Sequence, residues 1–222
     1  FMLGTPMKPV YSEEIQTRGL GLKVEAYDPQ GNPVTEEKGE LVCTLPFPSM
    51  PVYFWNDEDK SRYLSAYFED YPGVWKHGDY IKITENGGVI VYGRSDATLN
   101  PGGIRIGTAE IYRVVEAMDE VKDSLAAGKE INGDTQVVLF VVLEDNYTLN
   151  PELEKQIKKE IKSELTPRHI PKIIKQVSDI PHTLNGKKVE LAITNIINGN
   201  KVPNKASLAN PGCLDEYENM EI

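Results

Sequence analysis

A short stretch near the middle of the chain brings together residues that could bind a charged ligand. Arg94 and Asp96 lie where the residue pattern changes. A glycine pair, Gly102 and Gly103, and a second arginine, Arg105, follow shortly after. A guanidinium has a permanent charge and a planar set of donors that suit phosphate or ribose oxygens. The stretch therefore indicates a ligand-contacting hinge, or alternatively a plain strand-to-loop connection with a surface ion pair.

Regular patterns on both sides supply the elements that would hold this stretch. Residues 81–93 alternate between apolar and polar positions around a Glu-Asn-Gly-Gly turn, as a β-hairpin does. Apolar residues recur with helical spacing over 109–118, and Thr108 is a suitable N-cap residue. We therefore expect a boundary at 94–98, which divides the chain into residues 1–94 and 95–222.

The first part reads as a series of short strands. Alternation predicts strands at 21–27 and 40–45, and further strands within 74–93. A helix is expected over 57–68, with Asn56 as its N-cap and acidic residues in its first turn. Strands broken by turns at this density favour a small antiparallel, β-barrel-like subdomain.

The second part mixes strands and helices, so the fold class predicted for the whole chain is α+β. The strand at 136–143 is apolar throughout, which is typical of a strand buried on both faces. From about residue 198 the tail is polar, so it either wraps a surface or is disordered. The other predicted elements are strands at 104–106, 121–128 and 173–177 and helices at 151–165 and 191–197.

Composition restricts the partners and the setting of the protein. The net charge of −10 and the pI near 4.9 argue against broad binding to nucleic acid or anionic membranes. No apolar run approaches the ~20 residues of a membrane span. Cys43 and Cys213 lack partners at metal-ligand spacing, so no metal site is expected and they fit reduced thiols of a cytoplasmic protein. The chain opens on Phe-Met-Leu-Gly, and we expect it to be part of something longer.

Three motifs together resemble those of the adenylate-forming acyl-CoA synthetases. GRSDATLNPGGIRIGTAEI at 93–111 resembles the hinge motif of that family, and WKHGD at 75–79 resembles its aromatic-x-x-Gly-Asp motif. PHTLNGK at 181–187 resembles its C-terminal loop. Among the branches of the family, FPSMPVYFWND, WKHGDY and LNGKKVE are most similar to the acetoacetyl-CoA synthetases, and this similarity covers essentially the whole chain.

The resemblance implies a reaction in two halves. A carboxylate, here acetoacetate, would attack the α-phosphate of ATP, which is bound with Mg²⁺, to give an acyl-adenylate and pyrophosphate. The thiol of coenzyme A would then attack the adenylate to give the thioester and AMP. A small α+β lid domain would rotate about the hinge between the two halves. We expect this chain alone to bind none of these substrates tightly.

The resemblance assigns three residues to the nucleotide and the hinge. Asp79 would accept hydrogen bonds from the ribose hydroxyls, although an aspartate after a glycine can also simply form a turn. Arg94 would contact the nucleotide as well. Asp96 would be the hinge residue, since hinge positions absorb backbone rotation while the flanking elements stay rigid.

Further residues are assigned to the two catalytic faces of the lid. Lys187 would be the catalytic lysine of adenylate formation, where its ammonium would stabilise charge between the carboxylate and the α-phosphate. Lys188 follows directly, and only the motif register selects Lys187. Gly102, Gly103 and Arg105 would form the loop that faces coenzyme A. On composition alone, these lysines and Arg105 would read as solvated surface charges.

Several basic side chains remain outside these motifs. Lys162, on the polar face of the helix at 151–165, and Arg168 could meet the phosphates of coenzyme A, although a basic helix face is usually only solvated. His77, His169 and His182 lack partners at metal or catalytic-triad spacing, and we read them as ordinary.

The resemblance also implies which part of an enzyme this chain supplies. Residues 1–94 would be the C-terminal, β-rich portion of a large N-terminal domain, and residues 95–222 would be the lid. The Gly/Ser/Thr-rich phosphate loop of the family is not found in this sequence, so the chain alone is expected to be inactive. Two alternatives remain open: another short-chain acyl-CoA synthetase, such as acetyl-CoA synthetase, and a free-standing, lid-like binding module.

Overall fold

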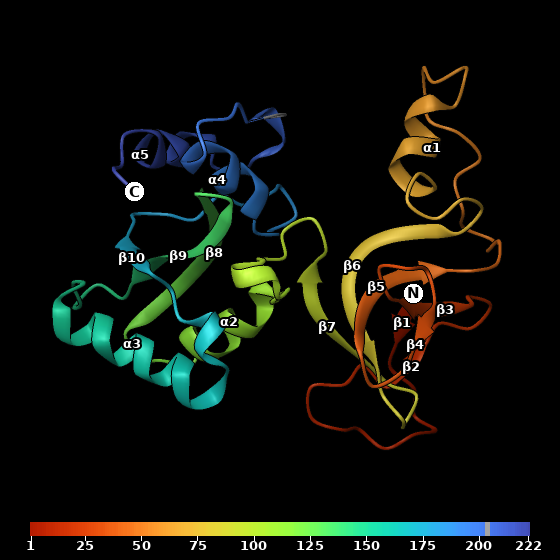
Figure 1. Ribbon diagram of the computed structural model, residues 1–222, viewed down its shortest axis with the longest axis horizontal. Coiled ribbons are helices and arrows are strands. Elements are labelled where there is room, and N and C mark those ends of the chain that lie inside the picture. The colour runs from red at the N-terminus through yellow and green to blue at the C-terminus, as the bar shows by residue number, and fades with distance from the viewer. Residues whose placement is uncertain (203–204) are drawn as a thin grey trace. The chain divides into compact units, whose positions relative to one another are not determined.

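The chain folds into two compact units, residues 1–96 and 97–222, each with its own core (Figure 1). The computed structural model describes residues 1–202 and 205–222. Both units contain sheets and helices, so the predicted α+β class is confirmed. Within the described residues, no helix combines the length and the apolar character needed to cross a lipid bilayer.

The first unit is built on a five-stranded antiparallel sheet in the order β4-β3-β5-β6-β7. The sheet is open rather than closed into the expected barrel. Closure would need β4 and β7 to pair, and β4 is an edge strand of two residues that pairs only with β3. A separate two-stranded sheet joins β1 and β2. The strands are β1 (Met2–Leu3), β2 (Thr17–Arg18), β3 (Val24–Tyr27), β4 (Pro33–Val34), β5 (Lys38–Cys43), β6 (Trp75–Ile83) and β7 (Val89–Arg94).

The helix of this unit begins later than its sequence predicts. Helix α1 spans Ser61–Tyr67, and not 57–68. The N-cap residue is Lys60 and not Asn56, and its side chain makes no capping hydrogen bond. The carboxylate of Asp57 serves the first turn instead: its Oδ1 accepts from the N–H of Arg62 at 3.0 Å and its Oδ2 from the N–H of Tyr63 at 2.9 Å. Asn56 and Lys60 both have positive φ angles, 54° and 58°, which interrupt the helical path before Ser61.

The second unit contains a three-stranded sheet in the order β10-β9-β8. Strands β8 (Val121–Ile131) and β9 (Asp134–Leu143) form an antiparallel hairpin, which runs beyond the predicted strand ends to a two-residue Asn-Gly turn. Strand β10 (Ile173–Gln176) pairs in parallel with β9. Residues 137–141 of β9 are buried, as expected for a strand covered on both faces.

Helices cover both faces of this sheet (Figure 1). Alternate residues of β8 and β9 point to opposite sides, so the hairpin divides the core into two clusters. One cluster joins Ala126, Leu139 and Val141 to the apolar faces of α2 (Thr108–Val115) and α3 (Pro151–Glu164). The other joins Leu125, Val138 and Phe140 to α4 (Glu190–Ile197) and α5 (Leu214–Glu218).

The structure corrects the predicted strand at 104–106 and decides between the two predictions for the tail. The predicted strand at 104–106 is only an isolated bridge between Leu99 and Ile106, beside a 3-10 turn, η1 (Pro101–Gly103). The tail wraps the surface, with Leu208, Leu214 and Tyr217 buried against α4 and the sheet. Residues 203–204 of the predicted tail lie outside the described residues. The other 3-10 turns are η2 (Pro167–His169), η3 (Lys205–Ser207) and η4 (Pro211–Cys213).

Candidate functional site

Strand pairing in the first unit brings three of the predicted site residues together. Asp79 on β6 lies opposite Arg94 on β7 in the strand register. The guanidinium of Arg94 forms a two-pronged pair with Asp96, with Nη2 3.0 Å from Oδ2 and Nε 3.3 Å from Oδ1. Its Nη1 lies 3.8 Å from Oδ1 of Asp79. Arg94 therefore sits between two carboxylates while half of its side chain stays exposed.

The backbone beside Asp79 is shaped to receive this arginine. Gly78 has a φ of +85°, and a Cβ atom there would lie 2.7 Å from Nη2 of Arg94. A side chain at this position would therefore be strained and would displace the guanidinium. Burial lowers the pKa of Arg94, but the hydrogen bond and charge of Asp96 and the charges of Asp79 and Glu40 outweigh burial, so the pKa is raised.

A pocket of about 450 Å³ lies beside these residues, within the first unit. The ring of Tyr67 stacks on that of Trp75, with centroids 3.6 Å apart and planes 16° apart. Aromatic rings, the cationic side chains of Lys76 and Arg94 and the carboxylate of Asp96 therefore line one space, which suits a planar, polar ligand. The lining residues are Ala66, Tyr67, Trp75, Lys76, His77, Gly78, Arg94, Ser95 and Asp96.

Glu40 on β5 is a member of this site that the sequence reasoning missed. Its side chain is buried, and Oε1 accepts from the N–H of Gly78 at 3.1 Å and from Oγ of Ser95 at 3.0 Å. These two partners stand next to Asp79 and Arg94, so one buried carboxylate ties together the strands that carry the site. The available signal was an acidic residue opening an apolar strand segment, ELVCTL.

In the second unit the glycine loop is braced from two sides. The N–H of Gly102 donates to Oδ1 of Asp134 at 2.8 Å. Nη1 of Arg168 donates to the carbonyl oxygens of Pro101 at 3.1 Å and Gly102 at 3.4 Å. Gly102 has a φ of +59°, and a Cβ atom there would lie 2.5 Å from that Nη1. Arg168, which we considered as a phosphate ligand, thus holds the loop itself, while Arg105 is exposed.

Lys187 lies at the end of an exposed turn. The N–H of Thr183 donates to the carbonyl of Lys187 at 2.8 Å, and the N–H of Lys187 donates to Oγ1 of Thr183 at 3.1 Å. The Lys187 side chain is exposed, and no residue in the described ranges forms a hydrogen bond or ion pair with its ammonium. This ammonium is therefore available to a ligand.

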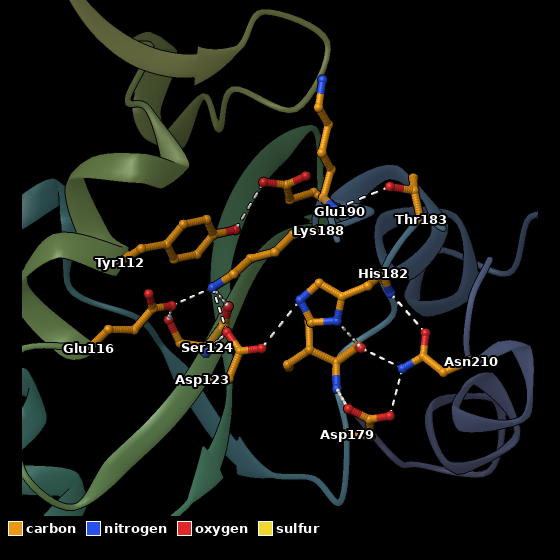
Figure 2. A network of polar contacts seen from close by, with 12 residues as sticks. Tyr112, Glu116, Asp123, Ser124, Asp179, His182, Thr183, Lys188, Glu190 and Asn210 are labelled. Carbon is orange, nitrogen blue, oxygen red and sulfur yellow. Dashed lines mark hydrogen bonds and ion pairs between the residues drawn. The ribbon is translucent and has the colours of Figure 1, made fainter. Parts of the chain in front are cut away.

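The neighbouring Lys188 is placed in the opposite way (Figure 2). Its Nζ lies 2.6 Å from Oδ1 of Asp123 and 2.7 Å from the carbonyl of Ser124, and it also contacts the carboxylate of Glu116. The centroid of the Tyr112 ring is 4.3 Å away. Of the two consecutive lysines, Lys187 presents its charge to solvent and Lys188 is committed to contacts within the unit.

The histidines have more defined partners than expected. Nε2 of His182 lies 3.4 Å from Asp123, and Nε2 of His77 lies 3.5 Å from Asp79. His169 is buried, with Nδ1 2.9 Å from Oγ1 of Thr166. In the part of the chain that the structure describes, no group of three or more His, Cys, Asp or Glu side chains is placed to hold a metal ion.

Comparisons with known proteins find one family model that matches part of the chain and relatives that match nearly all of it. Residues 110–187 match the family of the AMP-binding enzyme C-terminal domain. The chain is 52% identical over 221 residues to the acetoacetyl-coenzyme A synthetase of Rhizobium meliloti (strain 1021), covering 100% of this chain and 34% of that protein. It is 48% identical over 214 residues to the Gallus gallus acetoacetyl-CoA synthetase, covering 96% of this chain and 32% of that one.

A solved structure agrees with these sequence matches. Acetoacetyl-CoA synthetase from Streptomyces lividans superposes with a TM-score of 0.88 at 44% identity, over 95% of this chain and 32% of that structure. The resemblance expected from the three motifs is therefore confirmed. The chain spans about a third of the length of the curated relatives it matches.

Proposed function

Since this chain is homologous over its whole length to acetoacetyl-CoA synthetases, we propose that it forms the hinge and lid of an ATP-dependent acetoacetate–CoA ligase. The observation that carries the proposal is the 52% identity over 221 residues. The substrates would be acetoacetate, ATP with Mg²⁺ and coenzyme A, and the products acetoacetyl-CoA, AMP and pyrophosphate. Residues 1–94 would end the large N-terminal domain, and residues 95–222 would be the lid.

Asp79 and Arg94 would hold the nucleotide. An ionised carboxylate can accept from both vicinal hydroxyls of a ribose, and Asp79 is partly exposed beside the pocket. Arg94 already pairs with two carboxylates, and its exposed half could donate to ribose or phosphate oxygens. Glu40 would keep both strands in register while the ligand is exchanged.

Lys187 and the glycine loop would serve different halves of the reaction. In adenylate formation, negative charge accumulates where the acetoacetate carboxylate meets the α-phosphate, and the free Lys187 ammonium would stabilise it. In thioester formation, Gly102, Gly103 and Arg105 would face the pantetheine arm of coenzyme A. Backbone without Cβ atoms allows that arm to approach closely.

The test uses the full-length enzyme with Lys187→Ala. Pyrophosphate exchange, which reports adenylate formation, should be abolished, whereas thioester formation from supplied acyl-adenylate should be largely retained. Lys155→Ala, which removes an exposed lysine on α3, is the matched control and should keep both activities. Normal exchange in Lys187→Ala would remove the proposed role. A carboxylate panel separates acetoacetate from acetate as the preferred substrate, and so tests the acetyl-CoA synthetase alternative.

The 222-residue chain by itself should form no thioester. Catalysis needs both substrates held together, and the phosphate loop of the family is not found in this sequence. AMP release that depends on coenzyme A, measured with the purified chain, would contradict this expectation. Ligand binding by the chain without turnover would favour a binding module. We also place the protein in the cytoplasm, where the free Cys43 and Cys213 would stay reduced.

A further inference from the structure

The ammonium of Lys188, next to the proposed catalytic Lys187, is fully engaged with protein acceptors (Figure 2). An ammonium has three N–H donors. For Lys188 the acceptors are a carboxylate oxygen of Glu116, Oδ1 of Asp123 at 2.6 Å and the carbonyl of Ser124 at 2.7 Å. All three donors are therefore used, on one group at the C-terminal end of α2 and two groups on β8.

The charges around Lys188 favour this single position. Its side chain is only 20% exposed, and two carboxylates face it. Opposite charges attract more strongly in a partly buried site than at the surface. Without the ammonium, Glu116 and Asp123 would be left close together with no lysine between them. Oγ of Ser124 also donates to Glu116 at 2.7 Å, which fixes that carboxylate in turn.

The chain beyond Lys188 is attached to the same helix at a second point. Oε1 of Glu190 accepts from the hydroxyl of Tyr112 at 3.2 Å and from Oγ1 of Thr108 at 3.3 Å. Thr108, Tyr112 and Glu116 are spaced by four residues, so they share one side of α2. This side of α2 holds the chain at both Lys188 and Glu190, immediately after Lys187.

The other end of the exposed turn is fastened as well. The N–H of His182 donates to Oδ1 of Asn210 at 2.9 Å, and its Nδ1 donates to the carbonyl of Ile180 at 2.8 Å. Asn210 donates to the same carbonyl at 2.7 Å and to Oδ2 of Asp179 at 2.6 Å. Lys187 therefore lies on a short turn with both ends fixed to the unit.

We propose that Lys188 is a positioning residue for adenylate formation, an inference that rests on the function proposed for Lys187. The antiparallel bridge between His182 and Lys188 keeps this segment extended. Successive side chains of an extended segment point to opposite sides, so drawing Lys188 inward directs Lys187 outward. Misplacement of a reacting group by about 1 Å can cost about 10²-fold in rate. The contacts that hold Lys188, and with it the direction of Lys187, would therefore affect the rate of adenylate formation.

The experiment compares Lys188→Met and Lys188→Arg in the full-length enzyme. In Lys188→Met, pyrophosphate exchange should fall about 10- to 100-fold, while thioester formation from supplied acyl-adenylate should change less than about threefold. Lys188→Arg keeps a cation and should recover most of the exchange. A parallel loss of both half-reactions, or wild-type exchange in Lys188→Met, would overturn the positioning role.

If Lys188→Met does not fold, Glu116→Gln tests the positioning role of Lys188 instead. Glutamine still accepts hydrogen bonds from Lys188 and Ser124 but lacks the charge, so exchange should fall by a smaller factor of about 3 to 10, with thioester formation spared. Unchanged exchange in Glu116→Gln would overturn the inference in that case.

Lys187→Ala is the reference variant that distinguishes the positioning role of Lys188 from the proposed catalytic role of Lys187. If Lys187→Ala keeps normal exchange, the proposed role of Lys187 and this inference both fall. If it loses exchange while Lys188→Met keeps it, only the positioning role falls.

Discussion

At the scale of single residues, the buried Glu40 stabilises the first unit through its two hydrogen-bond partners. Its Oε1 satisfies the N–H of Gly78 and the hydroxyl of Ser95 in a buried position. Glu40→Ala would leave both donors without this acceptor, which costs about 1–3 kcal/mol for a buried group. We expect the free energy of unfolding of residues 1–96 to fall by that amount in chemical denaturation. The exposed Glu37→Ala is the control and should change stability by less than about 0.5 kcal/mol.

The Cys213 thiol gives the second unit a pH dependence on the alkaline side. Burial, followed by the charge of Asp179, raises the pKa of Cys213 from its ordinary value of 9.0 to about 11. The folded state therefore prefers the protonated thiol. Its contribution to stability is complete below pH 9, where the thiol is protonated in both states, and is lost as the pH rises towards 11.

Denaturation of the chain at pH 8, 9, 10 and 11 checks this prediction. Cys213→Ala removes the titrating group, so its unfolding free energy should fall less between pH 9 and 11 than that of the unaltered chain. Tyr112 remains in both proteins with its pKa raised chiefly by burial, so its effect cancels in the comparison. Burial, followed by the charge of Cys213, raises the pKa of Tyr217, so the difference between the two proteins reports Cys213 together with its effect on Tyr217. Equal slopes in the two proteins would show that Cys213 does not contribute.

At the scale of elements, the sequence predicted those helix boundaries that are set by residues adjacent in the chain. Helix α3 begins at Pro151 as expected, because Oδ1 of Asn150 accepts from the N–H of Leu153 at 2.9 Å. The predicted start of α1 was wrong because two residues with positive φ angles precede the helix, and the spacing of apolar residues does not reveal such angles. Motif resemblance indicated Asp79, Arg94 and Lys187 as site residues, and their roles stay predictions.

The partners of those residues could not be predicted from the sequence. Glu40 reaches across 38 and 55 residues to Gly78 and Ser95. Lys188 reaches across 64 and 72 residues to Ser124 and Glu116. Such pairs depend on which strands and helices pack together, and local pattern carries no information about them. The motif register selected Lys187 over Lys188, and the fold adds that Lys188 is engaged by other residues of the unit.

The glycine loop gives a prediction that belongs to elements rather than to one side chain. Two side chains of opposite charge bind the backbone of this loop: Asp134, at the start of β9, and Arg168, on η2. If they act as braces, Asp134→Ala and Arg168→Ala in the full-length enzyme should both raise the KM for coenzyme A, by about 3- to 10-fold, and spare pyrophosphate exchange.

The charge of Asp134 makes this test selective. A carboxylate does not bind the phosphates of coenzyme A, so a higher KM in Asp134→Ala would not reflect a lost phosphate contact. Lys155→Ala, which removes an exposed lysine on α3 that lies outside the predicted sites, is the control and should leave the KM unchanged. If Arg168→Ala alone raised the KM, a direct phosphate contact would replace the brace.

At the scale of the whole molecule, the chain consists of two units with separate cores, and Asp96 is the last residue of the first unit. The residue before it is hydrogen-bonded to the sheet: the N–H of Ser95 donates to the carbonyl of Gly78 at 3.0 Å, and its hydroxyl donates to Glu40. A backbone rotation at Asp96 would leave these contacts intact. This is what a hinge requires, since the flanking elements must stay rigid.

Asp96→Pro in the full-length enzyme tests the proposed hinge. Proline fixes its own φ near −65° and restricts the residue before it, so it should hold one backbone conformation and impair one half-reaction at least about 10-fold more than the other. Asp96→Ala is the matched control, because it also removes the carboxylate that pairs with Arg94 but leaves the backbone free. Pyrophosphate exchange and thioester formation from supplied acyl-adenylate are measured separately for both variants. An equal loss of both half-reactions in Asp96→Pro, or the same imbalance in Asp96→Ala, would mean that Asp96 acts through its side chain and is not the pivot.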